Sequence, residues 1–96
     1  MSIEQLLHEK RTDIERIATR HRVIRVRIFG SAARGEATDE SDIDLLVDTG
    51  PVTSAWFPAG LMLDLEALLG RRVEIVTERV LRPELRESIL RDARPL

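Results

Sequence analysis

Apolar and acidic residues alternate between residues 42 and 48 except at Leu46, and this pattern constrains the fold more than any other feature of the chain. A period of two predicts a β-strand whose two faces differ in character. The apolar positions form the buried face: Ile43, Leu45 and Val47. Residues two apart in a strand point the same way, so Asp42 and Asp44 place two carboxylates side by side on the other face. The segment therefore predicts a strand that is buried on one face and charged on the other.

Helical and strand patterns alternate along the rest of the chain. Apolar residues at helical intervals predict a first helix between residues 3 and 18. Residues 23–29 alternate and predict a strand with Ile24 on its buried face. Turn residues and apolar spacing indicate four further elements: a short helix at 32–34, a helix at 58–69, a strand at 72–77 and a helix beginning at Pro83. Three to four helices packed on a small mixed sheet of about three strands make an α/β fold.

Length and composition limit the class of protein. The 96 residues suit one small domain spanning residues 1–96, and the net charge of −2 argues against a general nucleic-acid binder. The chain has no cysteine, which excludes disulfides and thiolate metal sites. It has no run of the roughly 20 consecutive apolar residues that a bilayer span requires, and we expect no export leader. We therefore expect a cytoplasmic protein with no direct nucleic-acid partner and no membrane partner.

The acidic face of the central strand points to a bound cation. Two adjacent carboxylates in a sheet repel each other, so Asp42 and Asp44 imply a metal ion or an arginine partner. Oxygen ligands alone suit a hard ion such as Mg²⁺ or Mn²⁺, which keeps water ligands and accepts phosphate oxygens. Asp48 shares this face at the far end of the strand, where we expect it to be solvated. On the preceding strand, Arg25 and Arg27 could line a nucleotide cleft or contact an acidic partner.

The Gly30-Ser31 pair has the features of a phosphate-binding loop, because it joins a strand to a short helix. Glycine lets backbone N–H groups approach a phosphate closely, and the Ser31 hydroxyl can cap the helix and donate to the phosphate. The helix dipole favours the negative charge. With two aspartates at the start of the next strand, the pair predicts a phosphate-plus-metal site of the kind used in nucleotidyl transfer. Arg34 lies near this loop and could contact a triphosphate, or it could be an exposed turn residue.

Glu74 is the best candidate for a third carboxylate. A site of this kind needs another acidic group to complete the metal ligands and to accept the proton of an attacking hydroxyl. Val73 and Ile75 form the buried face of their strand, which turns Glu74 the other way. The alternative is an ion pair between Glu74 and Arg71 or Arg72.

These residues together resemble the minimal nucleotidyltransferases (MNT), the smallest members of the DNA polymerase β superfamily of nucleotidyltransferases. The resemblance is carried by Gly-Ser at 30–31, ten intervening residues and then Asp-Ile-Asp at 42–44. The run Gly-Arg-Arg-Val-Glu-Ile-Val-Thr at 70–77 and the tail from residue 81 extend it over nearly the whole chain. The resemblance implies a nucleotidyltransferase-like α/β fold.

The resemblance also implies an activity and a set of residue roles. The activity is Mg²⁺-dependent transfer of a nucleoside monophosphate from an NTP to a hydroxyl, with release of pyrophosphate. Asp42 and Asp44 would bind two Mg²⁺ ions, and Glu74 would complete the metal site and help to deprotonate the acceptor. Gly30 and Ser31 would hold the β- and γ-phosphates. The family usually has aspartate where this chain has Glu74, whose longer side chain changes the reach of the carboxylate.

A partner is implied as well. Many members of the family that this chain resembles are antitoxins paired with a HEPN-domain toxin, which is a helical RNase. These antitoxins transfer AMP from ATP to a tyrosine of the toxin. This chain has no tyrosine and cannot be its own tyrosine acceptor. We expect an adenylyltransferase that uses ATP and Mg²⁺ and acts as the antitoxin of a HEPN toxin. The alternatives are an antitoxin of the same fold that neutralises its partner by binding alone, and a transferase that acts on a small molecule.

Overall fold

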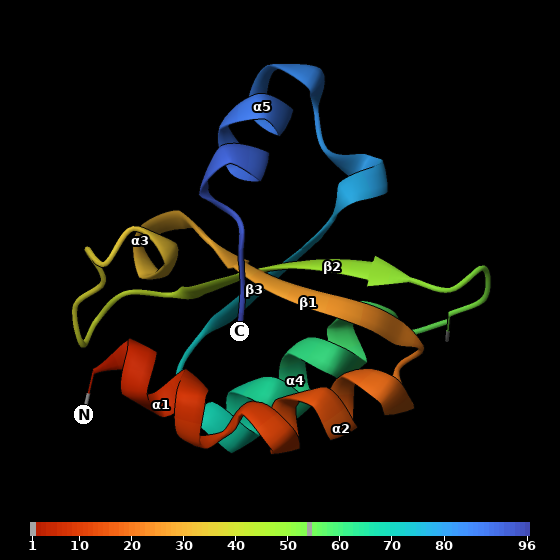
Figure 1. Cartoon of the computed structure of the whole chain (residues 1–96). Coiled ribbons are helices and arrows are strands. Elements are labelled where there is room, and N and C mark those ends of the chain that lie inside the picture. The colour runs from red at the N-terminus through yellow and green to blue at the C-terminus, as the bar shows by residue number, and fades with distance from the viewer. Residues whose placement is uncertain (1, 54) are drawn as a thin grey trace.

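The computed structural model describes residues 2–53 and 55–96 as an α/β fold (Figure 1). None of the helices in these ranges is both long and apolar enough to cross a membrane. In chain order the elements are α1 (Ile3–Glu9), α2 (Arg11–Arg20), β1 (Val23–Phe29), α3 (Gly30–Ala33), β2 (Ile43–Thr49), α4 (Ala59–Leu69), β3 (Val73–Thr77), the 3-10 helix η1 (Glu78–Val80), α5 (Pro83–Asp92) and β4 (Arg94–Pro95).

The strands form one mixed sheet in the order β3-β2-β1-β4. β1 runs antiparallel to both of its neighbours, whereas β2 and β3 run parallel. β2 is therefore a central strand with β1 and β3 on its two sides. The expected fold class is confirmed. Within the described residues the sheet has four strands and the chain five α-helices, where the sequence predicts about three strands and three to four helices.

Helices cover the two faces of the sheet unequally. α1, α2 and α4 lie together against one face, and α5 lies over the other (Figure 1). The apolar side chains of β2 pack into the first layer, where Ile43, Leu45 and Val47 are fully buried as predicted. The three helices contribute most of the other buried side chains of this core: Ile3, Leu7, Ile14, Ile17, Ala18, Leu61, Leu65 and Leu69. Burial of this apolar surface anchors β2, so residues on its other face have defined positions.

The opposite face of β2 has a thinner apolar cover. Leu46 is fully buried on this face, although α5 contributes no fully buried side chain. Asp44 and Asp48 lie on either side of Leu46 and share its face, because strand residues two apart point the same way. The acidic residues of β2 therefore lie on the thinly covered side of the sheet, which carries α5.

Two sequence predictions are wrong in detail. The predicted first helix is two helices, because the backbone at Lys10 leaves the helical region with ψ of 6°. Ile24, predicted to be buried, is 75% exposed, and Val23 is buried instead. A β-bulge between Val23 and Arg25 adds one residue opposite β2 and shifts the alternation. The elements that the sequence does not predict, η1 and β4, are too short to show a period.

Candidate active site

The register of two parallel strands brings the predicted third carboxylate to the predicted pair. β2 and β3 are paired with Asp44 directly opposite Glu74. Neighbouring strands lie about 4.8 Å apart, so long polar side chains at paired positions on one face can touch. The Glu74 carboxyl group is near enough to Asp44 to influence the pKa of that residue. Glu74 faces this way because Val73, the preceding residue, fills the core on the other side of β3.

Asp44 lies in an environment that disfavours its charged form. Burial, the charge of Glu74 and the charge of Asp42 together raise the pKa of the Asp44 carboxyl from 3.8 to about 6. The positive charge of Arg34 acts against this shift but does not cancel it. A cation bound between these groups would reverse the shift, because it would favour the carboxylate over the carboxylic acid.

The carboxylate cluster consists of Asp42, Asp44 and Glu74. Asp42 is exposed and precedes β2, which begins one residue later than predicted. No ion pair among the described residues involves a member of the cluster. Within residues 2–53 and 55–96, no group of three or more acidic or histidine side chains can hold a metal by itself. This donor set fits a hard divalent ion that takes further ligands from phosphate oxygens and water.

Gly30 brings the backbone against Asp44. It directly follows Phe29, which pairs with Asp44 across β1 and β2. Gly30 has φ of +70°, in the left-handed region that favours glycine. A Cβ atom at this position would lie 3.2 Å from Asp44 Cγ and would collide with Asp44 Oδ2. The close approach that requires glycine here is therefore to the Asp44 side chain, and its role in phosphate binding stays a prediction.

Ser31 lies inside α3 rather than at its cap. The helix begins at Gly30 with Phe29 as the N-cap residue, and no side chain caps it. The predicted capping role of Ser31 is wrong, because α3 starts earlier than the predicted short helix. The Ser31 side chain is partly buried, and its hydroxyl takes part in none of the side-chain hydrogen bonds found within the described part of the chain. The hydroxyl is therefore able to donate to a ligand.

Arg34 connects α3 to α5. Its Nε atom donates to Glu36 Oε1 at 3.1 Å, and its Nη1 atom donates to Asp92 Oδ2 at 2.7 Å. These two carboxylates raise the pKa of Arg34, so the guanidinium remains charged. The structure thus places Arg34 close enough to influence Asp44 while its donors face Glu36 and Asp92.

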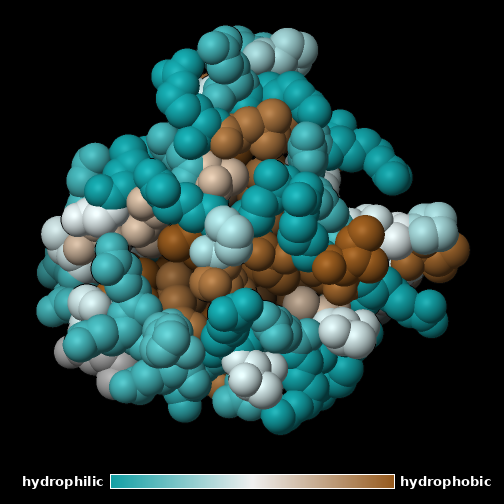
Figure 2. Space-filling model, in the orientation of Figure 1, coloured by the Kyte–Doolittle hydropathy of each residue, from teal (hydrophilic) through white to brown (hydrophobic). Residues whose placement is uncertain are grey.

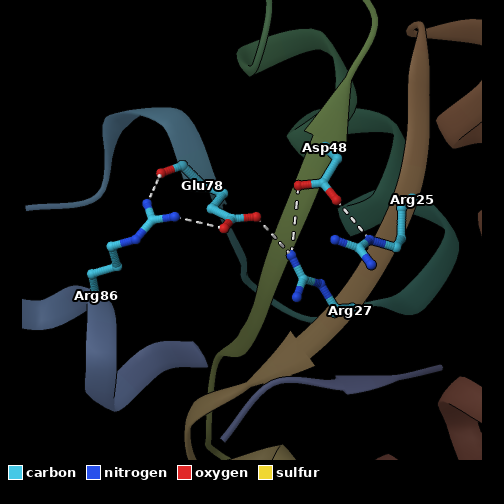
Figure 3. A network of polar contacts seen from close by, with 5 residues as sticks. All are labelled: Arg25, Arg27, Asp48, Glu78 and Arg86. Carbon is cyan, nitrogen blue, oxygen red and sulfur yellow. Dashed lines mark hydrogen bonds and ion pairs between the residues drawn. The ribbon is translucent and has the colours of Figure 1, made fainter. Parts of the chain in front are cut away.

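A network of ion pairs occupies the other end of this sheet face (Figure 3). Asp48 accepts a hydrogen bond from Arg25 Nε at 2.6 Å and lies 3.6 Å from Arg27 Nη2. Arg27 also donates to Glu78 at 3.2 Å, and Glu78 accepts from Arg86 of α5 at 2.8 Å. The prediction that Asp48 is simply solvated is wrong, because it pairs with two arginines. Since both arginines are used here, they do not neutralise the carboxylate cluster.

The carboxylate cluster lies on an open surface, because Asp42 and Glu74 are exposed and Asp44 is only partly buried. One pocket of about 340 Å³ is lined by α2, β1 and the last residues of the chain, and another of about 310 Å³ lies at the far ends of β2 and β3. Neither pocket is lined by a residue of the cluster. Figure 2 shows apolar surface between α5 and the α1–α2 layer, beside β1, where the first pocket opens. A ligand at the cluster therefore keeps one side open to solvent or to a second protein.

In the metal-free protein, the contribution of Asp44 to stability is expected to fall as the pH rises from about 4 to about 6. Over this range the folded state keeps a proton on Asp44 that the unfolded state has released, so the stabilisation is complete below about pH 4 and is lost as the pH passes about 6. Melting curves in EDTA should compare the wild type with Asp44→Asn. Above about pH 6 the free energy of unfolding of the variant should exceed that of the wild type by about 1 kcal/mol, allowing for solvent screening of a half-exposed group. A difference that is constant with pH would show that the Asp44 pKa is ordinary.

Residues 10–96 match the family profile described as a nucleotidyltransferase domain. The chain belongs to this family. The match includes every residue of the carboxylate cluster together with Gly30, Ser31 and Arg34. The predicted family is therefore confirmed, and the protein is an enzyme of the nucleotidyltransferase class.

Two curated relatives carry more specific names. The protein adenylyltransferase MntA of Thermococcus cleftensis is 38% identical over 88 residues, which cover 83% of this chain and 89% of the relative. A protein of Methanocaldococcus jannaschii, provisionally named a protein adenylyltransferase, is 38% identical over 87 residues, or 91% of this chain and 94% of the relative. Each alignment thus covers most of this nucleotidyltransferase and most of the relative.

Solved structures confirm the expected fold. A structure provisionally described as a minimal nucleotidyltransferase superposes with a TM-score of 0.85 at 49% identity, and it covers 100% of this chain and 97% of that chain. A crystal structure of a toxin–antitoxin with AMP-PNP superposes with a TM-score of 0.75 at 20% identity, covering 88% of this chain and 69% of that one. At that identity the second likeness concerns the fold alone.

Proposed function

We propose that this nucleotidyltransferase transfers AMP from ATP to a hydroxyl group of a protein and acts as an antitoxin. The observation that most directly supports transfer is the pairing of Asp44 with Glu74 across β2 and β3, against the Gly30 backbone. The names of the two curated relatives support a protein as the acceptor. The occurrence of the same fold in a toxin–antitoxin with AMP-PNP supports ATP as the donor and a toxin as the partner.

The residues of the site have separate roles in this proposal. Asp42, Asp44 and Glu74 hold two Mg²⁺ ions, and the Gly30 N–H and the Ser31 hydroxyl bind the β- and γ-phosphates. Mg²⁺, when bound, neutralises the triphosphate and makes the α-phosphorus easier to attack. The acceptor oxygen forms a bond to the α-phosphorus while the bond from that phosphorus to the bridging oxygen breaks, and pyrophosphate leaves. Glu74 accepts the proton of the acceptor hydroxyl.

Arg34 adds a positive charge on the phosphates. Its guanidinium offers donors in a planar fork that suits phosphate oxygens. The ion pair with Asp92 joins two partly exposed side chains, and such pairs contribute little free energy and exchange readily. We expect Arg34 to replace Asp92 with a phosphate oxygen when ATP binds.

The acceptor in this proposal is a tyrosine of a HEPN-domain toxin, as the family resemblance implies. This chain has no tyrosine, so a tyrosine acceptor belongs to another molecule. The open surface at the carboxylate cluster leaves room for a protein acceptor. A small-molecule acceptor, in contrast, is usually held in a concave pocket that buries most of its surface.

The proposed transfer is tested by the intact mass of a candidate HEPN-domain toxin after incubation with this protein, ATP and Mg²⁺. We expect mass increments of one or more AMP groups, and we expect none with the double variant Asp42→Asn/Asp44→Asn. Peptide mapping of the modified toxin should place the AMP on tyrosine. A stable complex that inhibits the toxin without any increment, and that survives the double substitution, would instead establish neutralisation by binding alone.

A further inference from the structure

Arg71 holds the loop that leads into the site. Its Nη2 atom donates hydrogen bonds to the carbonyl oxygens of Thr38 and Ser41, both at 2.8 Å. Ser41 immediately precedes Asp42, so the second bond fixes the peptide group that joins them. Two bonds from one guanidinium nitrogen thus fix the end of the loop just before the carboxylate cluster.

The guanidinium of Arg71 is partly withdrawn from water to make these contacts. Its Nε atom is buried and has no hydrogen-bond partner among the described residues. Arginine in such a position usually pairs with a carboxylate, but none of the ion pairs between described residues includes Arg71. The predicted alternative, in which Arg71 neutralises Glu74, is therefore not what the structure shows. Burying a charge is unfavourable unless the charged group forms hydrogen bonds. For Arg71 these are the hydrogen bonds to the two loop carbonyl oxygens.

The loop is closed around the same two residues. The Thr38 N–H donates to Ser41 Oγ at 2.9 Å, and the Ser41 N–H donates to the Thr38 carbonyl at 3.1 Å. Arg71 itself lies in the turn between α4 and β3. It therefore connects the segment that delivers Asp42 with the segment that delivers Glu74. These two segments are otherwise far apart in the chain.

We propose that Arg71 is a positioning residue for the metal ligands, because it holds Asp42 in place beside Asp44 and Glu74. The inference rests on the proposed function, which assigns these carboxylates to Mg²⁺. A residue in this role raises the affinity of the site for the metal, because it orients a metal ligand without contacting the ion itself. Loss of such an outer contact typically costs about 10- to 100-fold in metal affinity or activity.

The experiment compares Arg71→Ala with Arg72→Ala and Arg71→Lys. Arg72 is the next residue and is exposed, and its side chain takes part in none of the hydrogen bonds or ion pairs found in the described ranges. Binding of Mn²⁺ is measured with and without AMP-PNP by electron paramagnetic resonance of the free ion, and AMP-PNP without protein is the blank. AMP transfer is measured as a function of Mg²⁺ concentration, and thermal melting reports whether each variant is folded.

Arg71→Ala is expected to weaken Mn²⁺ binding about tenfold and to raise the Mg²⁺ concentration for half-maximal transfer by a similar factor. Arg72→Ala should change neither quantity. Arg71→Lys should recover most of the affinity, because an ammonium group can donate to both carbonyl oxygens. If Arg71→Ala does not fold, Arg71→Gln takes its place, since its shorter amide cannot reach both carbonyls.

Equal Mn²⁺ affinity in Arg71→Ala and Arg72→Ala would overturn the positioning role, even if Arg71→Ala melts at a lower temperature. Wild-type protein that binds no Mn²⁺, with or without AMP-PNP, would overturn both the positioning role and the proposed metal site. Weakened Mn²⁺ binding by Arg71→Ala, combined with no AMP transfer by any protein, would support the positioning role and refute the proposed function.

Discussion

Asp44→Asn is expected to lower the rate of AMP transfer about 10³-fold or more. Asparagine keeps the shape of the side chain but lacks the negative charge that a divalent cation requires. In the metal-free protein the same substitution removes the cost of burying a charged carboxylate and the repulsion from Glu74 and Asp42, which together raise the pKa of Asp44. The melting temperature at pH 7 should therefore rise while activity falls, as is typical of residues kept for function. Transfer rates and melting curves of the same preparation check both expectations.

Asp48→Asn is the matched control, because Asp48 lies on the same face of the same strand. Asp48 forms ion pairs with Arg25 and Arg27 and is placed away from the carboxylate cluster. Its substitution should lower the free energy of unfolding by about 1 kcal/mol, because Arg27 is largely buried and loses a partner. Transfer should stay within about twofold of wild type. Equal losses of transfer in both variants would refute a specific role for Asp44.

Gly30→Ala is expected to reduce AMP transfer by at least about 10²-fold. The added Cβ meets the carboxyl group of Asp44, whose far end can rotate away more easily than the backbone can move. Relief of the collision therefore displaces the proposed metal ligand. The left-handed backbone conformation adds a cost of about 1–2 kcal/mol in stability. The measurement is the transfer rate at several Mg²⁺ concentrations, together with the melting temperature.

Gly70→Ala separates the collision from the backbone cost. Gly70 ends α4 with φ of +67°, close to that of Gly30, but a Cβ there would meet no atom of the described residues within 4 Å. Its substitution should lower stability by a similar 1–2 kcal/mol, or roughly 4–16 °C in melting temperature for a domain of this size. Transfer at a temperature where both proteins are folded should be unchanged. If Gly70→Ala loses transfer as Gly30→Ala does, the effect is one of stability and not of Asp44 position.

Local sequence patterns predict those features of the fold that depend only on the backbone conformation of neighbouring residues. The alternation in β2 predicts its buried face and the direction of Asp44, and Pro83 marks the first residue of α5. The same patterns fail where an extra residue or an earlier start shifts the position of side chains within an element. Ile24 is exposed because of a bulge, and Ser31 is not a cap because α3 starts earlier. Hydrogen bonds to neighbouring segments decide these details.

The carboxylate cluster illustrates the division between sequence and structure. By itself, the sequence determined that Asp44 and Glu74 each point away from a buried strand face, because the alternation of side chains in a strand is a property of the backbone. Only the tertiary structure decided that these residues are paired, that Asp48 is neutralised by arginines, and that Arg71 binds loop carbonyls. Strand register and side-chain partners depend on packing between segments distant in the chain, and no local period contains that information.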